Sequence, residues 1–185
     1  MDFVRALRAR RDVLAAAETL CASDVHKAAD AVCTALSAHN KILTIGNGGS
    51  AAISQHFAAE LVVRFVRARR AYPALALTAD SAILTAAGND FGYPTVFRRQ
   101  IEAYAFPGDV VCAFSTSGSS PNVVTALETA RDLRCVTVGF TGSAGVGLAP
   151  LCNVLCVVPS SVTAIIQEVH DMMVHFICEQ VDGLS

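Results

Sequence analysis

The 185-residue sequence has no tryptophan, only three methionines, and few charged residues, which make up 16% of the chain. Basic residues do not outnumber acidic ones, and the formal net charge of −2 gives no reason to expect a nucleic-acid partner. No apolar run approaches the ~20 residues of a membrane-spanning helix, so no membrane partner is expected. The arginine-rich N-terminus lacks the apolar core of a signal peptide, and Asp2 and Asp12 argue against a mitochondrial presequence.

CxxC spacings are also absent, although the chain has seven cysteines. Most of these cysteines lie in apolar stretches, where the side chain behaves as a small hydrophobic group. An odd number of cysteines without a disulfide framework indicates reduced thiols and predicts a cytoplasmic location. The apolar fraction of 53% is high for a soluble monomer and indicates further burial between subunits.

Short apolar segments alternate with helical patterns after residue 38. The expected strands are Ile42–Ile45, Ala74–Leu77, Val110–Phe114, Cys135–Gly139 and Val154–Val158. These segments mostly lack period-two alternation, which is typical of parallel strands buried on both faces. Helices are expected near Ser50–Phe65, Ser81–Ala87, Val96–Ala103, Pro121–Leu133 and Ser161–Val181. The pattern predicts an α/β fold, a three-layer sandwich in which helices flank a five-stranded parallel sheet.

No linker, repeat or low-complexity tract divides the chain, so residues 1–185 are predicted to be one domain. Residues 1–38 form its expected N-terminal helical segment, with Ser23 and Asp24 capping a second helix, and residues 39–185 form the α/β core. Gly88–Tyr93 is expected to be a polar loop and Gly142–Gly147 a flexible turn. The basic residues at the end of the Ser50–Phe65 helix are expected to be mostly solvated, and they are Arg64, Arg67, Arg69 and Arg70.

Two glycine- and serine-rich loops each join an expected strand to a helix. The first spans residues 46–50, with the sequence GNGGS, and the second spans residues 115–120, with the sequence STSGSS. Free amides at a helix N-terminus, close backbone approach at glycine, and serine hydroxyls together suit a phosphate and the hydroxyls of its carrier. The first loop is neither a P-loop nor a GxGxxG fingerprint. The plainer alternative is a pair of ordinary turns with serine N-caps.

Polar residues on two helices could supply chemistry. His56 and Glu60 are four residues apart and share one helix face. The last helix carries several polar groups in an apolar background, and they are Gln167, Glu168, His170, Asp171 and His175. Burying such groups without partners is unfavourable, so they either face water or meet in a site. Two imidazoles, a carboxylate and an amide oxygen could complete a zinc shell, although Gln167 and His175 are offset by ~80° around the helix axis.

Four segments carry a family resemblance: 46–65, 76–93, 115–124 and 166–175, the last with the sequence IQEVHDMMVH. In this order they resemble the sedoheptulose 7-phosphate isomerases, or phosphoheptose isomerases, of the sugar isomerase (SIS) domain family. The resemblance implies an aldose–ketose isomerase that converts sedoheptulose 7-phosphate to D-glycero-D-manno-heptose 7-phosphate. It also implies a homotetramer, assembled in part by the N-terminal helices, with active sites at subunit interfaces.

The resemblance assigns roles to individual residues. Glu60 and His175 would be the catalytic acid–base pair. A Zn²⁺ ion would be held by His56, Glu60, Gln167 and His175. The substrate contacts would be Asn47, Gly48, Ser50, Arg64, Asp80, Asn89, Asp90, Ser115, Thr116, Ser117, Ser120 and Gln167. One position departs from the family pattern, because Ile53 stands where many members carry Asp, and this removes a polar contact.

Other functions remain open from the sequence. A non-catalytic SIS protein could bind a protein partner such as a replication initiator, but the retained Glu60 and His175 favour an enzyme. An isomerase of another sugar phosphate would use the same loops, because such loops do not reveal the length of the sugar. A sugar-phosphate sensor would need the loops but no acid–base pair.

Overall fold

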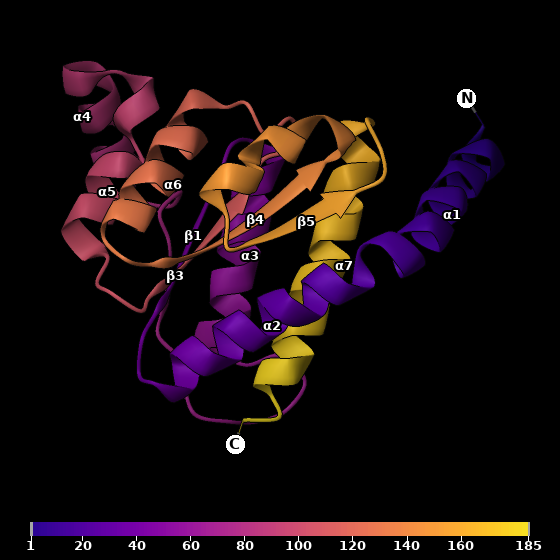
Figure 1. Ribbon diagram of the computed structural model, residues 1–185, viewed down its shortest axis with the longest axis horizontal. Coiled ribbons are helices and arrows are strands. Elements are labelled where there is room, and N and C mark those ends of the chain that lie inside the picture. The colour runs from indigo at the N-terminus through magenta and orange to yellow at the C-terminus, as the bar shows by residue number, and fades with distance from the viewer. Residues whose placement is uncertain (1, 185) are drawn as a thin grey trace.

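A five-stranded, all-parallel sheet forms the centre of the computed structural model, which describes residues 2–184 (Figure 1). Its strands are β1 (Ile42–Gly46), β2 (Ala74–Ala76), β3 (Val110–Phe114), β4 (Val136–Gly142) and β5 (Val154–Val158). Their spatial order is β2-β1-β3-β4-β5. The predicted five-stranded parallel sheet is therefore confirmed, and β4 continues three residues beyond its predicted end.

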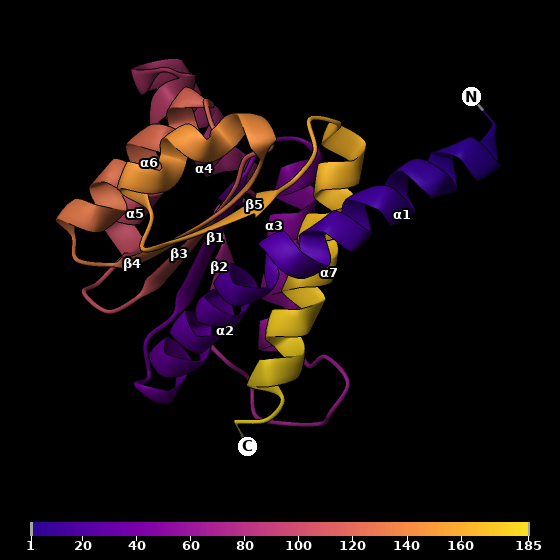
Figure 2. The ribbon, with the colours of Figure 1, turned by 45° about the vertical axis from the view of Figure 1, so that its right-hand side comes forward.

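Helices cover both faces of the sheet (Figure 2). They are α1 (Phe3–Leu20), α2 (Ala22–Ser37), α3 (Gly49–Val62), α4 (Ser81–Phe91), α5 (Arg98–Tyr104), α6 (Pro121–Asp132) and α7 (Thr163–Val181), with 3₁₀ segments η1 (Tyr93–Thr95) and η2 (Ser143–Leu151). Helices α2, α3 and α7 pack on one face, and α4, α5 and α6 pack on the other. This arrangement gives the three layers expected from the sequence.

The apolar strands explain why the sheet is covered on both sides. In β3, Val110, Cys112 and Phe114 belong to the core beneath α2, α3 and α7, while Val111 and Ala113 belong to the opposite core. Successive side chains of a strand point to opposite faces, so a strand that is apolar at every position needs a helix layer on each side.

The strand order places the two glycine- and serine-rich loops side by side. The chain passes from β1 to β2 on one side and later returns to β3 on the other side of β1. Gly46 at the end of β1 pairs with Phe114 at the end of β3, so both loops leave the same edge of the sheet at adjacent strands. This is the switch point at which doubly wound sheets bind ligands.

The N-terminal helices differ in detail from the prediction. Helices α1 and α2 are interrupted only at Cys21, which is the N-cap of α2, and Ser23 and Asp24 lie inside the helix. The predicted cap is wrong because the amides of Asp24 and Val25 donate to the Cys21 carbonyl. Helix α1 extends away from the sheet (Figures 1 and 2). Within residues 2–184, none of the helices has the length and apolar character to cross a bilayer.

Two predicted loops are helical. Residues 88–91 continue α4 instead of forming a polar loop, and residues 143–147 begin η2 instead of a flexible turn. Gly118, with φ +64°, packs directly against Gly145. A Cβ on Gly118 would clash with the Cα atom of Gly145, so a side chain cannot be accommodated there. The glycine-containing segment 142–147 therefore packs against the 115–120 loop. Helix α3 ends at Val62, three residues before its predicted end.

Candidate active site

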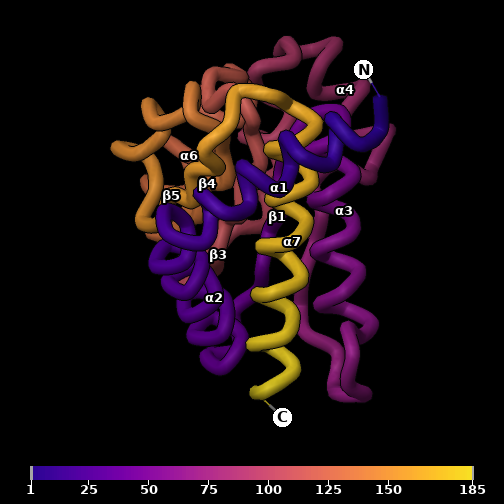
Figure 3. The backbone as a smooth tube through the Cα atoms, turned by 90° about the vertical axis from the view of Figure 1, so that its right-hand side faces the viewer, coloured from indigo at the N-terminus to yellow at the C-terminus, as the bar shows by residue number. Residues whose placement is uncertain are grey.

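Helices α3 and α7 run side by side on one face of the sheet (Figure 3). Gln167, near the start of α7, lies against Gly49 and Ser50 at the start of α3. His175, two turns further along α7, faces His56 in the middle of α3. The two helices are therefore parallel, and their facing surfaces carry the polar residues that the sequence singled out.

A polar cavity of about 150 Å³ lies between the two loops. It is lined by Asn47, Ser50, Phe114, Ser115, Thr116, Ser117, Ser120, Thr163 and Gln167. Three helices, α3, α6 and α7, begin at this cavity, and none of their N-cap residues makes a side-chain capping bond in the described structure. Their first-turn amides and aligned dipoles make the cavity suitable for an anion.

Glycines keep the first loop close to α7. Gly48 has φ +58°, a conformation that other residues rarely adopt. A Cβ on Gly49 would lie 2.7 Å from both the amide nitrogen and the amide oxygen of Gln167, so a side chain here would displace the Gln167 amide. Gly48 therefore serves the turn, and Gly49 leaves space for the Gln167 amide of α7.

An amide pair joins the first loop to the start of α6, directly after the second loop. Asn47 Nδ2 donates to Asn122 Oδ1, and Asn122 Nδ2 donates to Asn47 Oδ1, each over 2.9 Å. The Tyr93 hydroxyl also donates to Asn47 Oδ1, over 3.0 Å. Asn47 lines the cavity as predicted, but these bonds engage most of its hydrogen-bonding capacity. Asn122 and Tyr93 were not predicted, and no local sequence pattern distinguishes them.

A second, more open depression of about 480 Å³ adjoins the first. It is lined by Gly49, Ala52, Ile53, His56, Gln167, Glu168 and Asp171. Gln167 lines both depressions, so a ligand with an anionic end in the serine-lined cavity could extend toward His56. Ile53 is buried at the wall of this depression and packs in the core beneath it.

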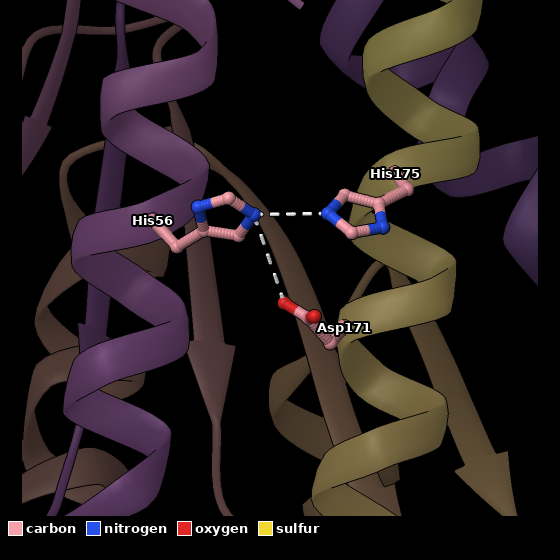
Figure 4. Close-up of side chains that lie close together, drawn as sticks. All are labelled: His56, Asp171 and His175. Carbon is pink, nitrogen blue, oxygen red and sulfur yellow. Dashed lines mark hydrogen bonds and ion pairs between the residues drawn. The ribbon is translucent and has the colours of Figure 1, made fainter.

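His56, Asp171 and His175 form a cluster between α3 and α7 (Figure 4). The two imidazoles approach with their Nε2 atoms 2.9 Å apart, and His56 Nε2 lies 4.0 Å from Asp171 Oδ1. Glu60 lies on the opposite side of the His56 ring, with its Oε1 atom 3.6 Å from Nδ1. One carboxylate therefore faces each nitrogen of His56.

The donor set of this cluster fits a transition metal such as zinc. His56, Asp171 and His175 offer ligand atoms that all lie within 4.8 Å of one another. Two nitrogens on one tetrahedral zinc are separated by about 3.3 Å, so the imidazoles would part slightly to accept an ion. Gln167 instead points to Ser50, with Nε2 3.4 Å from the Ser50 hydroxyl oxygen. Asp171 was noted among the polar residues of this helix but not predicted as a ligand, although its i, i+4 spacing from both Gln167 and His175 places all three on one side of α7.

Five predicted substrate contacts line neither depression. Gly48 lies in the first loop between two lining residues, Asn47 and Gly49, whereas the other four lie elsewhere on the chain. Arg64 is exposed in the segment after α3, and Asp80 caps α4 by accepting from the Ile83 amide over 2.9 Å. Asn89 and Asp90 are exposed on α4, where the Asn89 amide donates to Asp90 Oδ1. The chain itself does not bring these four residues to the serine-lined cavity.

His170 is buried on the core side of α7. Its ring lies against Phe114 and Phe140, its Nε2 atom lies 3.3 Å from the Thr141 carbonyl oxygen, and its Nδ1 atom has no partner in the described residues. Burial lowers the pKa of His170 to about 4, although the Thr141 carbonyl partly opposes this. The imidazole is therefore neutral at neutral pH and supports the end of β4.

The basic cluster is mostly exposed, as expected, but Arg69 is an exception. Its side chain is 0% exposed and pairs with Asp182, with Nε 2.8 Å from Oδ1. Arg64, Arg67 and Arg70 are exposed, as expected. The pair could not be predicted from local sequence, because its members are 113 positions apart.

Comparisons with known proteins agree with this arrangement. The SIS domain family matches residues 6–142. The phosphoheptose isomerase of Geobacter metallireducens is 47% identical over 181 residues, covering 98% of this chain and 96% of the relative. The phosphoheptose isomerase of Paramagnetospirillum magneticum is 53% identical over 150 residues, covering 81% of this chain and 78% of the relative.

A solved structure shows the same fold. The phosphoheptose isomerase of Neisseria gonorrhoeae is 36% identical and superposes with a TM-score of 0.92, covering 97% of this chain and 96% of that one. Both the sequence identity and the superposition extend over nearly the whole chain. The protein therefore belongs to the SIS domain family and, within it, to the phosphoheptose isomerases.

Proposed function

We propose that this protein is an aldose–ketose isomerase that interconverts sedoheptulose 7-phosphate and D-glycero-D-manno-heptose 7-phosphate. The observation that carries the proposal is the position of Gln167, which lines both the serine-rich cavity and the depression with His56 and Asp171. One ligand can therefore place a phosphate among the helix N-termini and a carbonyl carbon beside ionisable side chains. The relatives are named phosphoheptose isomerases, and the family resemblance supplies the specific sugar.

The phosphate belongs in the serine-lined cavity. Ser50, Ser115, Thr116, Ser117 and Ser120 supply hydroxyl and amide donors there, and the converging helix dipoles favour a dianion. Binding the phosphate fixes one end of an extended sugar, which leaves the carbonyl end to lie along α3 and α7. Holding the substrate in one orientation lowers the barrier to the reaction.

The reaction needs a base and an acid. The base removes a proton from the hydroxylated carbon beside the carbonyl, the electron pair forms the enediol carbon–carbon double bond, and an acid protonates the oxygen. The isomerisation is completed when the hydroxyl on the first carbon loses its proton to form the new carbonyl and the former carbonyl carbon gains a proton. We assign these roles to Glu60 and His175, which lie on opposite sides of the His56 ring. Both side chains are partly exposed and adjoin His56, which lines the open depression, although neither lines it directly.

We propose that the site binds zinc through His56 and His175. The family resemblance adds Glu60 and Gln167 to the ligand set, whereas Asp171 is the carboxylate nearest the facing Nε2 atoms. A bound zinc would supply a Lewis acid that polarises the carbonyl oxygen. A carboxylate that is bound to the ion is a weaker base, so the identity of the third ligand determines how freely Glu60 can accept a proton.

We also propose a homotetramer with active sites at the subunit interfaces. Exposed apolar side chains on α1 support it, and they are Phe3, Val4, Leu7, Leu14 and Leu20. Next to them, an apolar groove of about 390 Å³ lies between α1, α2 and α7. In such an assembly, Arg64, Asp80, Asn89 and Asp90 would contact the substrate in the site of a neighbouring copy.

Conversion of sedoheptulose 7-phosphate, followed by NMR, tests the proposal. The wild-type protein should yield the aldose heptose 7-phosphate. Glu60→Gln and His175→Asn should each lower turnover by about 10²–10⁴-fold, because each removes a proton-transfer group. Glu128→Gln, an exposed change on α6, is the matched control and should keep full activity. Near-normal rates in either site variant would refute these assignments.

An isomerase of another sugar phosphate is the second candidate. The buried Ile53 favours it, because this residue makes part of the sugar-side wall apolar. Conversion of a hexulose phosphate at a higher kcat/KM than the heptulose would select this candidate.

A further inference from the structure

A buried ion pair joins the ends of α3 and α7. Asp182 follows α7 directly and is 3% exposed. Its Oδ2 atom accepts from the backbone amides of Val66 and Arg67, over 2.9 and 2.8 Å, and its Oδ1 atom accepts from Arg69 Nε over 2.8 Å. Asp182 thereby fixes the 63–70 segment, which follows α3, to the end of α7.

Arg69 extends this connection to the last turn of α3. Nη2 donates to the Glu60 carbonyl over 2.7 Å, and Nη1 donates to the Leu61 carbonyl over 2.9 Å. Carbonyls in the last turn of a helix lack partners within the helix, so the guanidinium serves as a C-terminal cap. The guanidinium also lies over the Tyr72 ring, 4.9 Å from its centroid. One bond of this cap is made to the backbone of the proposed catalytic base.

The fixed segment also carries Phe65, which precedes the first amide bound by Asp182. The Phe65 ring stacks on His175, with a centroid distance of 5.4 Å and an interplanar angle of 26°. The His175 ring also contacts His56, and the two imidazole rings meet edge-on with an interplanar angle of 82°. His175 is therefore held between one ring that it stacks on and another to which it can hydrogen-bond.

We propose that Asp182, with Arg69, positions both members of the acid–base pair. The connection holds the backbone of Glu60 through the Arg69 cap, and it holds the His175 ring through Phe65. Asp182 bonds the 63–70 segment and Phe65 stacks on His175, so we assign both a positioning role that acts through other residues. The inference depends on the proposed roles of Glu60 and His175 in isomerisation.

The test combines kinetics with the NMR signals of His175. The variants are Phe65→Leu, which removes the stacked ring, Phe65→Tyr, which keeps it, and Asp182→Asn, which weakens the ion pair. Asp24→Asn on α2 and Phe106→Leu at an exposed site are the matched controls. Kinetics use sedoheptulose 7-phosphate, and the ring signals are recorded on protein with ¹³C-labelled histidine, with His175 assigned from His175→Asn.

We expect Phe65→Leu and Asp182→Asn to lower kcat by about 10- to 100-fold, the range typical of residues that orient site groups, with KM nearly unchanged. The His175 ring signals should move in both variants, because the ring current of Phe65 is lost or displaced. Phe65→Tyr should restore kcat and the signals. The double variant with Phe65→Leu and Asp182→Asn should have a kcat no lower than that of Asp182→Asn, since both changes act on the His175 ring.

A kcat of Phe65→Leu within twofold of wild type would overturn the proposal, as would unmoved His175 signals in folded Asp182→Asn protein. If Asp182→Asn does not fold, the two Phe65 variants still decide the outcome. If the wild-type protein does not isomerise the sugar, the proposed function fails. The ring signals then decide separately whether the ion pair positions His175.

Discussion

Polar side chains on α7 have different surroundings according to the side of the helix they occupy. Gln167, Asp171 and His175 face α3, where they line or adjoin the open depressions. His170 points into the core and is 0% exposed. The sequence showed that these residues interrupt an apolar helix, and the structure separates those available for chemistry from the one that supports the sheet.

The burial of His170 predicts a pH-dependent stability. Its pKa is about 4 in the folded protein, against an ordinary value of 6.5 when unfolded. The unfolded chain therefore binds more protons between these values, so the free energy of unfolding is highest above pH 6.5 and falls toward pH 4. The expected loss is about 3 kcal/mol, from 1.36 kcal/mol per pKa unit.

Urea unfolding between pH 4 and pH 7 measures this effect. His170→Gln keeps an N–H donor for the Thr141 carbonyl but does not titrate, so its stability should vary less across the interval. His39→Asn is the control, since His39 is exposed and its φ of 62° suits asparagine. An equal pH dependence in wild type and His170→Gln would show that another group is responsible.

The metal proposal is also tested at single residues. His56→Asn and His175→Asn should each weaken zinc binding by at least about tenfold, measured by competition with a chromophoric chelator, because an imidazole is a strong zinc ligand. Comparing Asp171→Asn with Glu60→Gln then identifies the carboxylate that completes the shell. Unchanged zinc affinity in both histidine variants would contradict a metal site between α3 and α7.

At the scale of elements, the first glycine-rich loop and α7 depend on each other. Gly49→Ala would place a methyl group against the Gln167 amide and displace it from the shared wall of the two depressions. We expect KM for the sugar phosphate to rise about 5- to 30-fold, which corresponds to one or two kcal/mol. Gly147→Ala is the matched control, since a Cβ there meets nothing within 4 Å. Equal KM values in the two variants would show that Gln167 is not needed for binding.

The sequence predicted the helices and strands better than it predicted which side chains of different elements come into contact. The strands could be predicted from apolar runs, and the two glycine- and serine-rich loops could be predicted from turns that precede helices. The nearness of Asp171 to His56 could not, because it depends on the register of α3 along α7. Local signals misled at Gly88 and Asn89, where turn-forming residues lie inside α4. Arg69 was misread because its partner, Asp182, belongs to a distant part of the chain.

In the whole molecule, α1 has exposed apolar side chains that the rest of the described chain does not cover. The proposed tetramer would bury this surface, so Leu7→Lys together with Leu14→Lys should dissociate the assembly. Light scattering coupled to size-exclusion chromatography measures the mass directly. The control is Val146→Lys, which changes an exposed apolar residue on η2. A wild-type monomer, or an unchanged mass in the double variant, would contradict the proposed role of α1.

We propose above that this chain moves a carbonyl group by proton transfer within a sugar phosphate. The most direct test is incubation with sedoheptulose 7-phosphate in deuterated water, with and without a chelator, followed by NMR. We expect a heptose 7-phosphate with deuterium at C2, and a lower rate with the chelator. No product and no exchange of the C1 hydrogens, from folded protein supplied with zinc, would contradict it.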